Sequence, residues 1–94
     1  MAAFDMLEHV KKALGQKGND HVNGPIQECI DEVREYLHTA GVPETVTGTK
    51  ECKGIVTRGV TDLWNYGSGS AALSPYFKER AAQLALKWQV IARE

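Results

Sequence analysis

One segment of the sequence carries a full set of helix signals. Gly24-Pro25 places a proline at the first helical position, where its missing N–H is not needed. Apolar side chains then recur at spacings of three and four, and Gly41 followed by Pro43 ends the pattern. The apolar positions are Ile26, Ile30, Val33, Leu37 and Ala40. This spacing predicts an amphipathic helix over residues 25–40, with one face buried.

The same spacing of apolar residues appears in three other segments. It predicts helices over residues 4–14, 51–66 and 75–92. The first of these has Lys11 and Lys12 near its C-terminus, where the helix dipole favours positive charge. The apolar stripes are Phe4, Leu7, Val10 and Leu14 in the first segment, Cys52, Val56, Val60 and Leu63 in the second, and Phe77, Ala81, Leu84, Trp88 and Ile91 in the third.

The segment 51–66 is the weakest of the four as a helix. Gly54 and Gly59 each cost roughly 1 kcal/mol of helix stability against alanine, so we expect tertiary packing to hold the segment. The same glycines would let a neighbouring helix approach closely. A strand over 55–61 and an interruption of the helix both remain open at this point.

The remaining segments are predicted to form loops. Residues 15–24 are rich in glycine and asparagine and predict turns. Residues 41–50 contain several valines and threonines, which are compatible with a short hairpin. Residues 67–73, GSGSAAL, predict a flexible connector. The expected fold is therefore all-α, a small bundle of four helices with long loops.

Length and charge narrow the class of protein further. A chain of 94 residues fits one domain, so we expect residues 1–94 to fold as a unit. The 11 basic and 12 acidic residues give a net charge of −1, whereas duplex-DNA binders usually have a basic excess. No apolar run approaches the roughly 20 residues that a bilayer requires, and the N-terminus lacks the basic region of a secretory signal.

The sequence contains little that favours catalysis. His9 lies one turn after Asp5, but no pattern of an activated serine or cysteine accompanies the pair. Cys29 and Cys52 are expected to be small buried side chains in a reducing compartment, and a disulfide between them remains open. We therefore expect no enzyme activity, no cofactor and no metal.

Charged and aromatic residues outside the stripes are the candidates for contact with a partner. The carboxylates of the second helix follow one flank at three-and-four spacing, which is typical of a solvated face and also suits pairing with a basic surface. Tyrosine and tryptophan near element ends suit interface anchors. The predicted partner-interface residues are Glu28, Glu32, Glu35, Lys50, Lys53, Arg58, Tyr66, Trp88 and Arg93.

Four sequence blocks follow one another in a recognisable order. An early helix, MLEHVKKAL, precedes a loop with Asn19-Asp20 and the helix IQECIDEVREYLHTAGVPE. A third helix ends in LWNY, and SPYFKERAAQLAL closes the series. Over about residues 4–91 this order resembles the head–tail connector proteins, also called adaptor or head-completion proteins, of tailed bacteriophages. The third helix departs from that pattern in its glycine and threonine content.

The resemblance implies a structural role without catalysis, in a phage or a prophage. It implies a closed ring of copies under the portal protein at the capsid vertex, assembled in the bacterial cytoplasm and carried in the virion. Such a ring extends the channel, retains packaged DNA without sequence-specific binding, and docks a stopper or tail-completion protein. The resemblance also implies that the isolated chain is often monomeric until it meets its partner.

Two other functions remain open from the residues themselves. The first is a small nucleic-acid-binding module, like a terminase small subunit or a repressor, in which helix 51–66 reads DNA and Lys50, Lys53 and Arg58 contact phosphates. The acidic second helix argues against it. The second is a small enzyme that uses His9 or His38, which the absence of a companion nucleophile disfavours.

Overall fold

The computed structural model describes residues 4–67 and 72–93, except for the side chains of 90–93. Every regular element within these ranges is helical, which confirms the all-α class. Short 3₁₀ turns at Asp20–Val22 and Lys50–Cys52 lead into two of the helices. The α-helices are α1 (Met6–Ala13), α2 (Asn23–Ala40), α3 (Glu44–Thr47), α4 (Lys53–Tyr66) and α5 (Pro75–Arg93).

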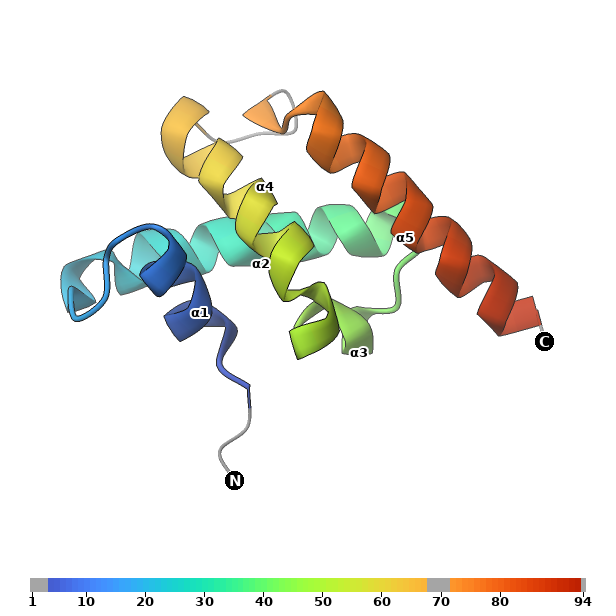
Figure 1. Cartoon of the computed structure of the whole chain (residues 1–94), viewed down its shortest axis with the longest axis horizontal. Helices are drawn as coiled ribbons and strands as arrows, with labels where there is room; N and C mark the ends of the chain where they lie inside the picture. The colour runs from blue at the N-terminus through green and yellow to red at the C-terminus, as the bar shows by residue number, and fades with distance from the viewer. Residues whose placement is uncertain (1–3, 68–71, 94) are drawn as a thin grey trace.

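Helix α2 is the axis on which the other long helices pack. In Figure 1 it runs across the centre, with α1 near its beginning, α4 crossing it and α5 beside its second half. The predicted stripe of α2 is buried at its first four positions, and Ala40 is half-buried at the helix end. Gly41 ends α2 in the left-handed conformation (φ +119°), as the sequence predicts.

The other predicted stripes also face the core. Some of their members are enclosed, and the others whose burial is described are half-buried against the core. The side chain of Ile91 lies outside the described residues. The enclosed members are Val10 of α1, Cys52, Val56, Val60 and Leu63 around α4, and Phe77 and Ala81 of α5.

Helix α4 is continuous, so the strand alternative over 55–61 is wrong. Gly59 is the point of closest approach, because a Cβ added there would lie 2.8 Å from both Val33 of α2 and Phe77 of α5. Gly54 has open space around it, so only one of the two glycines serves close packing. The hydroxyls of Thr57 and Thr61 donate to carbonyls one turn earlier, at 2.6 and 2.8 Å, and are satisfied within the helix.

The hairpin that the sequence allows over residues 41–50 does not form. Pro43, at φ −56° and ψ 136°, leads instead into the single turn of α3. The buried Thr47 donates its hydroxyl to the carbonyl of Glu44 at 2.9 Å, and Thr49 donates to Val46 at 2.7 Å. These threonines bond to local carbonyls, which favours a helical turn over a strand.

The predicted flexible connector over 67–73 lies largely outside the described residues, which omit 68–71. Its last residue, Leu73, is 4% exposed and belongs to the core. Leu73 is therefore part of the core before α5 begins.

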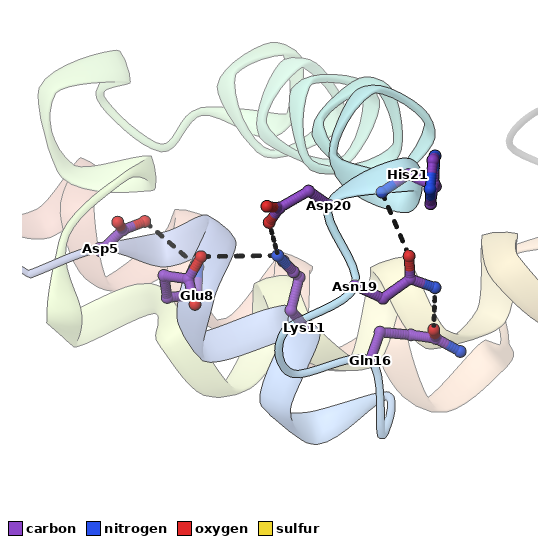
Figure 2. Close-up of polar contacts among 7 residues, drawn as sticks. All are labelled: Asp5, Glu8, Lys11, Gln16, Asn19, Asp20 and His21. Atoms are coloured by element: carbon purple, nitrogen blue, oxygen red, sulfur yellow. Dashed lines mark hydrogen bonds and ion pairs between the residues drawn. The ribbon is translucent and has the colours of Figure 1, made fainter.

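A buried ammonium joins α1 to the loop that follows it. Lys11 is 1% exposed, and its Nζ lies 3.4 Å from Asp20 Oδ1 and 3.6 Å from Glu8 Oε1 (Figure 2). Asn19, beside Asp20, accepts a bond from the His21 amide at 3.1 Å and so caps the first 3₁₀ turn. The sequence placed Lys11 at a favourable end of the helix dipole, and the structure gives it a tertiary contact as well.

The molecule is flat. Its Cα atoms extend over 43 × 37 × 16 Å, so the thin dimension accommodates little more than two layers of helix backbone. Two broad faces and a long perimeter are therefore exposed to solvent.

We predict opposite effects for alanine at the two glycines of α4. Gly59→Ala forces a methyl group against Val33 and Phe77, and we expect it to lower the free energy of unfolding by about 1–3 kcal/mol. Gly54→Ala, the matched control, meets open space and should raise it by up to about 1 kcal/mol. Urea denaturation followed by circular dichroism measures both. Equal effects would show that the close approach at Gly59 is not present.

We also predict that two adjacent lysines of α1 differ in their contribution to stability. Lys11→Ala removes a buried side chain and should cost about 1–3 kcal/mol. Lys12→Ala changes an exposed side chain and should alter the unfolding free energy by less than about 0.5 kcal/mol. Thermal and urea unfolding of the two variants provides the measurement, and a neutral Lys11→Ala would place that side chain in solvent.

Candidate interaction surfaces

The predicted partner-interface residues do not form one surface. Glu28 and Glu35 are exposed and Glu32 half-buried on α2. Lys50 and Arg58 are exposed and Lys53 is half-buried, on the second 3₁₀ turn and on α4. Tyr66 is 76% exposed at the end of α4, Trp88 is half-buried against the core, and the side chain of Arg93 lies outside the described residues. Acidic and basic candidates thus belong to different elements.

Helices α2 and α3 form an acidic groove, which we define by Asp31, Arg34, Glu35, His38, Glu44 and Thr47. Its volume is about 290 Å³. Asp31, Glu35 and Glu44 are exposed, so three carboxylates border the groove. The sequence pattern identified Glu35, but it missed Glu44 because the segment after Gly41 was compatible with a hairpin.

The guanidinium in the acidic groove is held in place. Arg34 Nε donates to Thr47 Oγ1 at 3.0 Å, and the Thr47 hydroxyl donates onward to the carbonyl of Glu44. The guanidinium also lies against Gly48, where an added Cβ would be 3.0 Å from Arg34 Cζ. Arg34 therefore links α3 to α2. Of the bordering carboxylates, Asp31 accepts a bond from Gln27 Nε2 at 2.9 Å, and Glu35 and Glu44 are exposed to solvent.

A second surface, the arginine–tyrosine cluster, consists of Arg58 of α4 with Tyr76 and Arg80 of α5. Tyr76 is 54% exposed, and the two guanidinium carbons lie 5.4 and 5.9 Å from its ring centroid. Both distances fit cation–π contact. Arg80 also donates to the Tyr76 hydroxyl at 3.4 Å. The i, i+4 spacing of Tyr76 and Arg80 was visible in the sequence, whereas the contribution of Arg58 depends on how α4 and α5 pack.

A buried carboxylate on α4 holds the arginine–tyrosine cluster in position. Asp62 of α4 is 3% exposed and accepts a bond from the Ser74 amide at 2.9 Å. The Ser74 hydroxyl in turn accepts from the Phe77 amide at 3.1 Å and caps α5. Arg58 Nε lies 3.6 Å from Asp62 Oδ1. Asp62 thus fixes the first turn of α5, and with it Tyr76, relative to α4.

The side chains of Asp5, His9, Cys29 and Cys52, which the sequence offers for catalysis, have structural surroundings. Asp5 accepts a bond from the Glu8 amide at 3.2 Å and caps α1, while the His9 ring lies against Phe4 with centroids 5.8 Å apart. Cys29 and Cys52 are free thiols. Burial raises the pKa of both thiols, and neighbouring carboxylates raise it further, so little thiolate forms near neutral pH.

Two further features follow from the described part of the chain. Its His, Cys, Asp and Glu side chains form no group of three or more that is suited to a metal ion. No helix within it is long and apolar enough to cross a membrane.

Comparison with known proteins gives no relative on which a function can be based. No protein-family model, curated protein or solved structure was found to match the chain.

We predict that Asp62 stabilises the fold more than its ion-pair partner does. Asp62→Ala leaves the Ser74 amide without its acceptor and should lower the unfolding free energy by about 1–3 kcal/mol. Arg58→Ala removes a half-exposed partner and should cost less than about 1 kcal/mol. Hydrogen exchange of the Ser74 amide should accelerate in the first variant only. Unchanged exchange in Asp62→Ala would show that the bond does not hold α5.

Proposed function

We propose that this protein is a structural subunit of the head–tail connector ring of a tailed phage or prophage. The proposal is supported by the order of sequence blocks that resembles this family and by an all-α fold with helices in the expected segments. The observation that carries it is a flat body with two exposed surfaces of opposite charge on different elements. Such a subunit suits a closed ring, because each copy there meets its two neighbours through different surfaces.

In this role the subunit docks on the portal protein, extends the DNA channel and joins the tail-completion or stopper protein. Its location would be the capsid vertex of the virion. The near-balanced charge of −1 suits a channel wall along which DNA slides, since strong phosphate binding requires an excess of basic residues.

A nucleic-acid-binding module is the weaker proposal. A recognition helix must present one full face to a groove of the duplex. Helix α4, which would have that role, packs against α1, α2 and α5, and its Arg58 is engaged with Asp62 and Tyr76. Lys50 and Lys53 remain available for phosphates, but the carboxylates of α2 oppose the approach of nucleic acid.

Binding to the portal protein encoded beside this chain tests the proposal. We expect the purified chain to co-elute with that portal and to add a ring of density below it in electron micrographs. A portal from an unrelated phage serves as the matched control and should not bind. Failure to bind the cognate portal, together with a mobility shift of DNA at low salt, would favour the nucleic-acid module instead.

A further inference from the structure

The arginine–tyrosine cluster has the chemistry of a contact site for carboxylates. Two guanidiniums flank one exposed ring. Arg58 already pairs with Asp62, whereas the ion pairs of the described residues include none to the exposed Arg80, which is therefore the guanidinium available to a carboxylate. Guanidinium groups bind carboxylates through paired hydrogen bonds, and Tyr and Arg are enriched where interfaces carry most of their binding energy. Tyr76, at 54% exposed, offers apolar area at the centre of this charge.

The acidic groove offers the complementary chemistry on the same chain. Asp31, Glu35 and Glu44 surround a hollow of about 290 Å³, and the one cation that lines it, Arg34, already donates to Thr47. The groove therefore has an excess of negative charge and a concave form, whereas the cluster is positive and exposed.

The two surfaces are built on different parts of the fold. The groove belongs to α2 and α3, and the cluster belongs to α4 and α5. In Figure 1, α3 lies at the lower edge of the molecule, and the end of α4 and the start of α5 lie at the upper edge. Within the described residues, no ion pair joins the two surfaces. Both surfaces are therefore open to a partner.

We propose that the arginine–tyrosine cluster of one copy docks on the acidic groove of the next copy. The inference rests on the proposed function in one respect: it takes the neighbour in the ring to be the partner. A second copy is favoured over nucleic acid because one chain supplies both complementary surfaces, whereas phosphates would be repelled by the groove. Contact between two different surfaces leaves the pair of copies with one cluster and one groove unused, so the contact can repeat, and it ends in a ring where the rotation between copies closes.

The proposal can be tested with variants that each lose one surface. Tyr76→Ala with Arg80→Ala removes the cluster and keeps the groove. Glu35→Lys with Glu44→Lys reverses the groove and keeps the cluster. Sedimentation velocity at low salt should show concentration-dependent association of the wild type, alone or with portal present, and at least about tenfold weaker association of each variant. Added salt should weaken the wild-type contact.

Mixing the two variants gives the decisive result. In the mixture the groove variant supplies an intact cluster and the cluster variant supplies an intact groove. We therefore expect a one-to-one heterodimer that does not grow further. Lys78→Glu on α5 and Glu28→Lys on α2 are matched controls: each reverses an exposed charge of the same sign outside the two surfaces, and each should associate like the wild type. Circular dichroism verifies the fold of every variant, and Glu35→Lys alone serves if the double groove variant fails to fold.

Two outcomes would overturn the inference. One is a wild type whose copies never contact each other, with or without portal. The other is a mixture of the two variants that stays monomeric while the wild type associates, which would show that another surface joins the copies. Binding of the wild type to portal is a separate readout, so the proposed function and this pairing can fail independently.

Discussion

The close approach of three helices at Gly59 sets how α2, α4 and α5 pack against one another. At this residue the backbone of α4 comes against Val33 of α2 and Phe77 of α5, with no room for a side chain. Interaxial distances depend on the residues at the contact, so a glycine here brings α4 nearer to its neighbours than a larger residue would. Phe77 follows Tyr76 directly, and Gly59 follows Arg58. The contact that closes the core therefore also aligns the residues of the arginine–tyrosine cluster.

Much of the secondary structure could be predicted because it depends on local spacing. Stripes of apolar residues and the stop at Gly41 predicted the four long helices, with ends that differ by at most two residues from those observed. The segment after Gly41 could be read in two ways, because valine and threonine favour extended backbone in isolation. Its threonines instead bond to carbonyls within three residues, and propensity alone does not reveal that choice.

The interaction surfaces could be predicted only in part, for a related reason. Glu35 and Arg58 were identified as exposed charges from helix periodicity, without the residues that accompany them. Tyr76 joins Arg58 only after α4 and α5 have packed, and Glu44 faces Glu35 only after α3 has formed. The burial of Lys11 and Asp62 was not predicted, because it accompanies contacts with Asp20 and Ser74, which lie 9 and 12 residues away in the chain.

The thin dimension of the molecule has a further consequence. With Cα atoms spread over only 16 Å in that direction, the core between the helices is thin. Such a body hides a smaller share of its apolar atoms than a sphere of equal mass. Any neighbour that covers one of its broad faces would withdraw more of that area from water. The melting temperature of the protein would then rise with the concentration of the neighbour that binds this face, as mass action requires.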